Sequence, residues 1–253
     1  MDISSYVLLS HEQALKRRLD VAANNIANMN TAGFRRERPV FREYVARDDS
    51  PAASAPSAPS NARTTSYVLD YGAMHDTASG SFQATGSALD LMIDGPGYLA
   101  VAAPGGGTAY TRAGFVRISQ DGELTTAGGL PILGEGGTPI TVPPEQLSTL
   151  SIGTDGTVTA KDGVLGRIAV TVFDDERGVS PRGDGLMAAT GGRELGAAET
   201  TLRTGGIEGS NVEPIVETTA MVDILRAYQT SMKMSQDIED MRRRAIDRLG
   251  KLG

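Results

Sequence analysis

The chain has 253 residues, 40% of them apolar, and a formal net charge of −7. This length and apolar content allow one large domain or two modest ones with a genuine hydrophobic core. Cysteine is absent and only His11 and His75 are histidines, which excludes disulfides, cysteine nucleophiles and a multi-histidine metal centre within one chain.

Charge is distributed unevenly. Residues 1–47 hold eight Lys and Arg against five Asp and Glu, and residues 212–253 hold seven of each, so the acidic excess lies in the middle. An acidic centre argues against nucleic-acid binding. The sequence also lacks a signal peptide pattern and the roughly 18 uninterrupted apolar residues of a membrane span. We therefore expect no direct membrane insertion.

Residues 1–47 begin with a helical pattern. Apolar residues and alanine recur in steps of four and three, interrupted at Glu12, which predicts an amphipathic helix close to a heptad repeat. These positions are Leu8, Leu15, Leu19, Ala22, Ile26 and Met29. The segment from Asn30 to Gly33 predicts the helix stop, because glycine suits a left-handed turn before extended chain at Phe34.

The next two regions differ in composition. Residues 48–66 are dominated by a Pro, Ala and Ser tract at 48–62, which predicts a linker or mobile loop. Residues 67–204 alternate short apolar runs with turn dipeptides, which predicts an antiparallel β domain. Tight hairpin turns are expected at Asp94-Gly95, Asp121-Gly122, Asp155-Gly156 and Asp162-Gly163.

Residues 205–253 carry a second helical stripe. Apolar residues again follow steps of three and four, mainly at Met221, Leu225, Tyr228, Met232, Ile238, Met241 and Leu249. Pro214 suits a first helical turn and no glycine or proline follows before Gly250, so we predict a helix of about 35 residues. The predicted fold class is α+β, mainly β: a central antiparallel β domain with long N- and C-terminal helices that pair as a coiled coil.

No pattern of catalytic or cofactor-binding residues is present. The glycines of residues 104–108 lack the Lys-Ser/Thr pair of a phosphate-binding loop and are better explained as a hairpin tip. The run Asp174-Asp175-Glu176 is better explained as a solvated turn than as a cation site. We therefore expect no catalytic residues, no metal, no cofactor and no enzymatic activity.

Several motifs resemble those of flagellar rod and hook proteins. Residues 19–35, LDVAANNIANMNTAGFR, resemble the N-terminal signature of that family, and residues 209–212 with Met221-Val222 and Arg226-Ala-Tyr228 resemble its C-terminal signature. Between them, residues 90–98 and 110–114 resemble the β domain that these proteins share. The likeness covers nearly the whole chain, apart from the tract at 48–62.

The resemblance implies a structural subunit of the flagellar basal-body rod. Its partners would be copies of itself and other rod subunits, together with the flagellar type III export apparatus, and its place would be the rod where it crosses the periplasm. Features such as Asp70-Tyr-Gly72 and Glu208 to Pro214 favour a proximal over a distal rod subunit. An export or assembly chaperone, and an enzyme with a β-solenoid body acting on wall polymers, are alternatives from other classes.

The stripes and the signatures together predict an assembly interface along the terminal helices. Its expected residues are Leu8, Leu15, Leu19, Ala22, Asn24, Asn25, Ile26, Asn28, Met29, Gly33, Phe34, Asn211, Val212, Met221, Leu225, Tyr228, Met232, Ile238, Met241 and Leu249.

Overall fold

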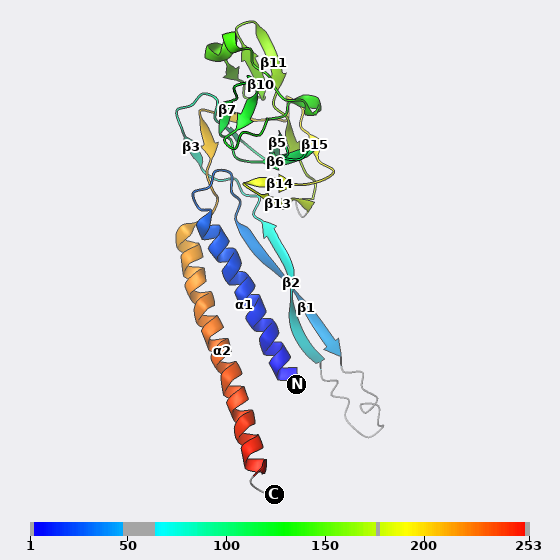
Figure 1. Cartoon of the computed structure of the whole chain (residues 1–253), viewed down its shortest axis with the longest axis vertical. Helices are drawn as coiled ribbons and strands as arrows, with labels where there is room; N and C mark the ends of the chain where they lie inside the picture. Colours follow the sequence, from blue (N-terminus) through cyan, green and yellow to red (C-terminus); the bar gives the residue numbers. More distant parts are fainter. Residues whose placement is uncertain (1–2, 48–63, 176–177, 251–253) are drawn as a thin grey trace. The chain divides into compact units, whose positions relative to one another are not determined.

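A computed structural model describes residues 3–47, 64–175 and 178–250. It divides into two compact units (Figure 1). The helical unit comprises residues 1–27, 37–74 and 213–253, and the β unit comprises residues 28–36 and 75–212. Each unit is thus assembled from segments far apart in the sequence. The Pro, Ala and Ser tract at 48–62 lies outside the described residues.

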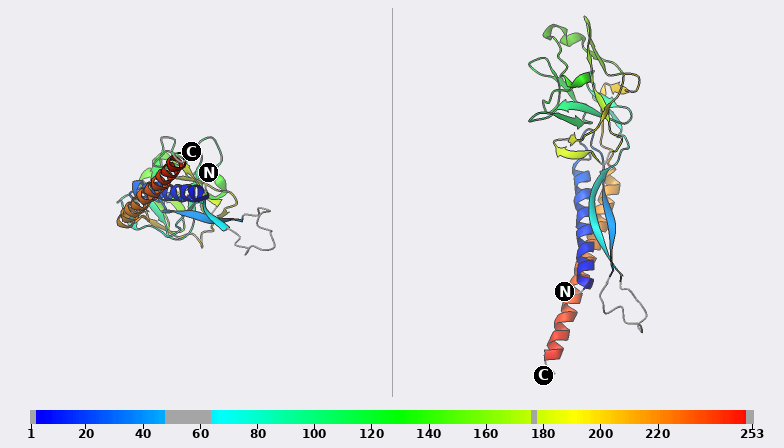
Figure 2. Two further views of the ribbon diagram at one scale, coloured as in Figure 1. Left: turned by 90° about the horizontal axis from the view of Figure 1, so that it is seen from below. Right: turned by 90° about the vertical axis from the view of Figure 1, so that its right-hand side faces the viewer.

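Two long helices pack side by side in the helical unit, α1 (Ile3–Ala27) and α2 (Pro214–Gly250). The predicted helix pairing is confirmed. The helices are antiparallel, because Asn25 near the end of α1 contacts Glu217 near the start of α2, and Ser231 farther along α2 contacts Glu12. α2 has 37 residues against 25 in α1, and in both Figure 1 and the right-hand view of Figure 2 it continues past the first residues of α1.

A two-stranded antiparallel ribbon completes the helical unit. It consists of β1 (Glu37–Arg47) and β2 (Thr64–His75). His75, the last residue of β2, belongs to the β unit. Arg17 of α1 pairs with Asp70 of β2 at 3.3 Å, and the Arg42 guanidinium lies 4.3 Å from the centre of the Tyr71 ring. An isolated two-stranded ribbon is marginally stable in water, so these contacts and those of β1 with α1 help to hold it.

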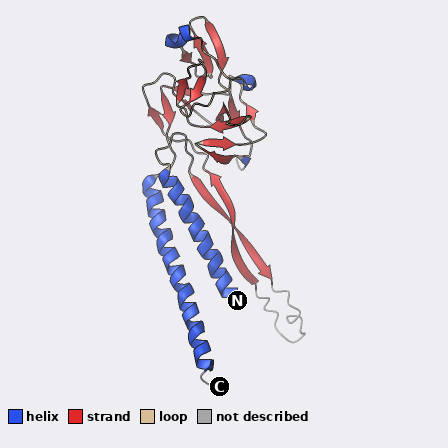
Figure 3. Ribbon diagram, viewed as in Figure 1, coloured by secondary structure: helices blue, strands red, loops and turns tan. Residues whose placement is uncertain are grey.

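The β unit contains short antiparallel strands in several small sheets (Figure 3). The largest sheet has the order β13-β14-β6-β5-β12-β15 and a second has the order β11-β10-β9, while β16 pairs with β4, β17 with β3 and β7 with β8. Their bounds are β3 Phe82–Ala84, β4 Leu91–Ile93, β5 Tyr98–Ala102, β6 Thr108–Thr111, β7 Val116–Ile118, β8 Leu124–Thr126, β9 Ser151–Ile152, β10 Thr157–Ala160, β11 Gly163–Arg167, β12 Val170–Val172, β13 Ser180–Gly183, β14 Leu186–Ala188, β15 Arg193–Glu194, β16 Leu202–Thr204 and β17 Gly206–Glu208. The predicted antiparallel β domain is confirmed.

The main hydrophobic core of the β unit is made of aliphatic side chains from most of these strands, among them Leu91, Leu99, Val101, Leu124, Ile132, Val142, Val158, Ile168, Val170 and Leu202. Two smaller clusters of buried residues are separate from it, one around Tyr98 and Phe173 and one around Ala100 and Leu133.

The predicted turns are largely confirmed. Gly122 and Gly156 have positive φ between paired strands, and Gly163 has a positive φ as the first residue of β11, opposite Ala160 of β10. The glycines of residues 105–107 form the tip of the β5–β6 hairpin. Gly95 also has a positive φ of 123°. However, Asp94-Gly95 joins β4 to β5, which belong to different sheets, so the expectation of a hairpin there is wrong.

Candidate assembly interface

One face of α2, which we call the inner face, packs against α1. Its buried or partly buried members are Glu217, Met221, Ile224, Tyr228 and Ser231. On α1 they meet Leu15, Leu19 and Ala22. Five of these residues, Leu15, Leu19, Ala22, Met221 and Tyr228, are among those expected from the sequence. Ile224 is the best buried apolar residue of α2, although the sequence pattern pointed to its neighbour Leu225.

Asn25 is a buried polar residue in this helical unit. Its Nδ2 donates hydrogen bonds to the Glu37 carbonyl at 2.9 Å and to the Glu217 carboxylate at 3.3 Å, while its Oδ1 accepts the Glu37 backbone N–H at 2.8 Å. One amide thus ties the end of α1 to the first residue of β1 and to the first turns of α2. A single buried polar contact of this kind fixes the register of paired helices.

The rest of the N-terminal signature lies in the β unit. The Gly33 N–H donates to the Glu208 carbonyl at 2.8 Å, and Gly33 adopts a φ of 68°. A Cβ at this position would lie 2.5 Å from the Arg112 backbone carbon, so both the backbone conformation and the close approach require glycine. The predicted left-handed turn at Gly33 is confirmed.

Next to Gly33 lies a buried group of charges formed by Arg35, Arg112 and Glu208, each less than 4% exposed. Arg112 Nη1 donates to Glu208 Oε2 at 2.8 Å, and the Gly80 N–H donates to Oε1 at 2.9 Å. Both guanidiniums lie within 6 Å of the Tyr98 ring centre. Burial and the Arg35 charge lower the pKa of Arg112, whereas Glu208 opposes that shift. Glu208 is therefore the counter-charge on which this part of the β unit depends.

Asn211 of the C-terminal signature binds backbone groups of the β unit. Its Oδ1 accepts the Arg36 N–H at 2.6 Å, and its Nδ2 donates to the carbonyls of Asp76 and Ala78 at 3.2 and 2.7 Å. Arg36 and Asp76 are also bonded directly, by the Asp76 N–H at 2.7 Å. Asn211 thus joins the segment that precedes β1 to the segment that follows β2.

A second face of α2 is apolar and exposed. This outer face consists of Ile215, Val222, Leu225 and Met232, which follow one another in steps of seven, three and seven. It is displaced by about one residue, roughly 100° around the helix, from the inner face. α2 therefore has two apolar faces, and α1 covers only the inner one.

The remaining expected residues occupy different environments. Leu8, Asn24, Ile26, Asn28, Phe34, Asn211 and Ile238 are partly buried, Val212 is buried, and Met29, Met241 and Leu249 are exposed. The expected set therefore divides into residues that contact their own chain and residues that leave apolar surface open. The sequence did not predict Glu217, Ile224, Ser231 or Arg112 as contact residues. The first three have no sequence pattern that marks them, and Arg112 pairs with Glu208, which is far away in the sequence.

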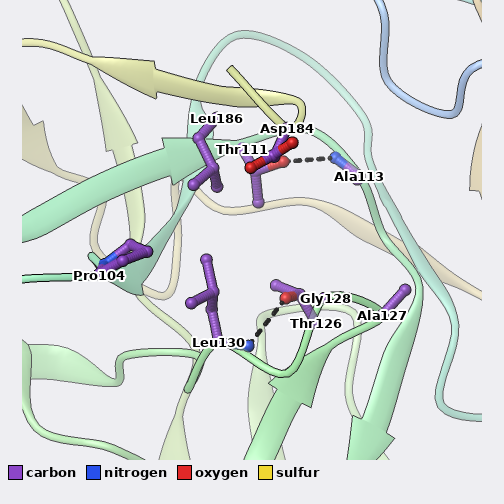
Figure 4. Close-up of a pocket in the computed structure, with 9 residues that line it drawn as sticks. All are labelled: Pro104, Thr111, Ala113, Thr126, Ala127, Gly128, Leu130, Asp184 and Leu186. Atoms are coloured by element: carbon purple, nitrogen blue, oxygen red, sulfur yellow. Dashed lines mark hydrogen bonds between the residues drawn. The ribbon is translucent and has the colours of Figure 1, made fainter. Parts of the chain in front are cut away.

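A cavity of about 400 Å³ lies in the β unit. Figure 4 shows Leu130, Leu186 and Pro104 around it, with Thr111, Thr126 and Asp184. Its two hydroxyls are used locally, because Thr111 Oγ1 accepts the Ala113 N–H and Thr126 Oγ1 accepts the Leu130 N–H.

Within residues 3–47, 64–175 and 178–250, no group of three or more acidic, histidine or cysteine side chains is arranged to hold a metal ion. Within the same ranges, no helix combines the length and the apolar character needed to cross a membrane.

Comparison with known proteins identifies the family. Residues 6–35 match the family described as flagella basal body rod protein, residues 92–160 match the flagellar hook protein FlgE/F/G D1 domain, and residues 203–248 match the flagellar basal body rod FlgEFG protein C-terminal region. The flagellar basal-body rod protein FlgF of Caulobacter vibrioides is 35% identical over 253 residues, covering the whole of both chains. The chain belongs to the flagellar basal-body rod protein family.

Other relatives support the same assignment. FlgF of Mesorhizobium japonicum is 32% identical over 99% of both chains, and FlgG of Bacillus subtilis is 33% identical over 91% of this chain and 93% of that protein. The protein is thus a FlgF-like structural rod protein and not an enzyme. The two motif regions that suggested the family lie within the matched segments at 6–35 and 203–248.

The buried charges of this rod protein generate a stability prediction. Glu208→Gln removes the counter-charge of the buried Arg112 guanidinium, which should lower the free energy of unfolding of the β unit by about 3–5 kcal/mol. Hydrogen exchange of the β5 amides measures this loss. Glu199→Gln, which breaks the exposed pair with Arg193, is the matched control and should leave exchange unchanged. Equal effects of the two changes would contradict the assigned role of Glu208.

The Asn25 contacts generate a second prediction. Asn25→Asp keeps the acceptor for the Glu37 N–H but removes the donor to two buried acceptors, each worth about 1–3 kcal/mol, and places a carboxylate against Glu217. Amide exchange in α1 and at the start of β1 should accelerate. Adding Glu217→Gln restores a donor and should recover part of the protection, whereas Glu217→Gln alone should have a smaller effect. Failure of the second change to recover any protection would show that Asn25 and Glu217 are not coupled.

Proposed function

We propose that this protein forms part of the flagellar rod by self-association through its terminal helices, in the proximal part of the rod. The observation that carries the proposal is the outer face of α2, where Ile215, Val222, Leu225 and Met232 are exposed although the inner face of the same helix is already packed. Contiguous exposed apolar surface marks a protein interaction site. Membership of the rod family makes other rod subunits the expected partners.

The ribbon of β1 and β2 adds a second surface of the same kind. Tyr44, Val45, Leu69, Tyr71 and Met74 are exposed on its two strands. Because such a ribbon gains little stability from its own pairing, burial of these side chains against another subunit would stabilise both the ribbon and the contact. The proposed interface therefore includes these ribbon residues as well as the expected residues of α1 and α2.

The proposal also includes how the subunit reaches the rod and where it lies. Similarity to FlgF over the whole chain supports a proximal position and export by the flagellar type III apparatus, followed by incorporation where the rod crosses the periplasm. Similarity to FlgG also extends over most of the chain, so a distal position is the second candidate.

The outer face and the inner face predict different mutant phenotypes. Leu225→Asp should leave both units folded but block incorporation into basal bodies and abolish swimming, because a carboxylate would be buried without a partner at the subunit contact. Tyr228→Asp should also accelerate amide exchange in α1, because Tyr228 packs within the helix pair. Thr230→Asp, at an exposed polar position of α2, is the control and should allow swimming. Normal swimming of the Leu225→Asp strain would refute assembly through the outer face.

The position along the rod is tested separately by electron cryo-microscopy of basal bodies. An epitope that replaces part of residues 51–60, labelled with antibody, should appear on the rod close to the inner membrane. Label farther out would assign the subunit to the distal rod. Tagged protein found only in soluble form, in cells that still swim, would contradict the rod assignment itself.

A further inference from the structure

The last turns of α2, at the red end of the chain in Figure 1, carry large apolar side chains that are open to solvent. Ile246 and Leu249 are 68% and 72% exposed, and every residue from Arg243 to Gly250 is exposed. Met241, at the start of these turns, is 60% exposed. We call residues 241–250 the end segment. Exposed apolar side chains that adjoin one another mark an interaction surface.

The apolar side chains of the end segment lie on one side of the helix. Met241, Ala245 and Leu249 follow one another in steps of four, and together with Ile246 they occupy an arc of about 140° around the helix axis. Asp247, the only acidic residue of the segment, lies roughly opposite the centre of this arc. The end segment is therefore amphipathic, with an apolar stripe as wide as those that helices normally bury.

The end segment is basic, whereas the chain as a whole has a net charge of −7. Its arginines are Arg242, Arg243, Arg244 and Arg248. By the same helical geometry Arg244 and Arg248 border the apolar arc on one side, Arg243 lies beyond its other edge, and Arg242 lies within it. Arg243 approaches Glu239 of the preceding turn only to 3.8 Å, and both side chains are well exposed, so this pair leaves the basic charge of the segment available to a partner.

The position of Arg242 distinguishes between two kinds of partner. A closed groove on another protein would bury the guanidinium together with its apolar neighbours, which is costly unless an acidic group meets it there. At a membrane surface the aliphatic part of an arginine lies along apolar groups while its charge stays among the lipid headgroups. An apolar stripe with basic residues around it is typical of helices that lie in a membrane interface. Ten residues with four arginines cannot span a membrane, since a span needs about 20 mostly apolar residues.

We propose that the end segment of the free subunit binds the surface of a membrane that contains anionic lipids. Ile246 and Leu249 would enter the boundary of the acyl chains, while the arginines contact lipid phosphates. An anionic surface repels the acidic remainder of the chain, which confines the contact to this end. The inference goes beyond the proposed function, which concerns the subunit in the assembled rod. Such a contact would concentrate the free subunit at the membrane before assembly.

The absence of Trp from the sequence allows a site-specific test in the full chain. Leu249→Trp introduces a single indole whose emission should shift to shorter wavelength with vesicles of equal parts phosphatidylglycerol and phosphatidylcholine, and should be quenched by lipids brominated on the acyl chain. Vesicles of phosphatidylcholine alone should leave the emission unchanged, and rising salt should reverse the shift. Val164→Trp, at a similarly exposed position of β11, is the matched control and should show no shift with either vesicle.

Second changes in the Leu249→Trp chain separate the charge from the apolar contact. Arg244→Gln together with Arg248→Gln should weaken partition into the anionic vesicles about 30-fold, since each basic side chain near such a surface contributes about fivefold. Arg226→Gln, at an exposed position earlier in α2, is the control and should leave partition unchanged. Ile246→Asp should abolish the shift. These positions are exposed, so amide exchange in α1 should stay unchanged and lost binding is distinguished from unfolding.

Three results would overturn the proposal. The first is an equal shift with anionic and neutral vesicles, or no shift with either. The second is flotation of the chain with anionic vesicles without a shift in the Leu249→Trp emission, which would show that another surface binds. The third is an equal shift with polyglutamate in place of vesicles, which would assign the end segment to an acidic protein surface. All of these measurements use the free subunit, so a negative result leaves the rod assignment to the basal-body experiments.

Discussion

Two asparagine side chains determine how the chain enters its β1–β2 ribbon. Asn211 accepts the backbone N–H of Arg36 within the β unit, and Asn25 binds both backbone groups of the next residue, Glu37, within the helical unit. The chain passes from one unit to the other between these two residues. A carboxamide suits this position because it supplies a donor and an acceptor together, as a neighbouring strand would. Each signature thus contributes one amide to the start of the same strand.

The pairing of α1 with α2 also depends on Asn25. Helices in isolation gain little stability in water, and most of their stability in proteins comes from packing an apolar face. Asn25 sets the register of that packing through Glu217, so Leu15, Leu19 and Ala22 lie opposite Met221, Ile224 and Tyr228. Because α2 is twelve residues longer than α1 in the described structure, this register leaves apolar surface open at its end.

The sequence was sufficient for the features that depend on local interactions. The two long helices, the positive φ of Gly33 and three of the four Asp-Gly hairpins follow from spacing and backbone preference. Met221 and Tyr228 of the inner face lie in the predicted stripe, but its buried members Ile224 and Ser231 each lie one position before the predicted Leu225 and Met232. The pairing of Arg112 with Glu208 joins residues 96 positions apart, and no local pattern indicates it. Gly95 has the expected positive φ, but packing decides which strands the Asp94-Gly95 turn joins.

Three residues that carry the family likeness act within their own chain, whereas Val222 of the C-terminal signature is exposed on the outer face of α2. Gly33, Asn25 and Asn211 all contact their own chain, so these parts of the signatures are explained by folding alone. Other apolar side chains stay exposed on α2, among them Leu225 on the outer face, Met234, Met241 and Leu249. Gly33, Asn25 and Asn211 therefore specify how a rod subunit folds. If the outer face binds a neighbouring subunit as proposed, a change at Leu225 should alter that contact without unfolding the protein.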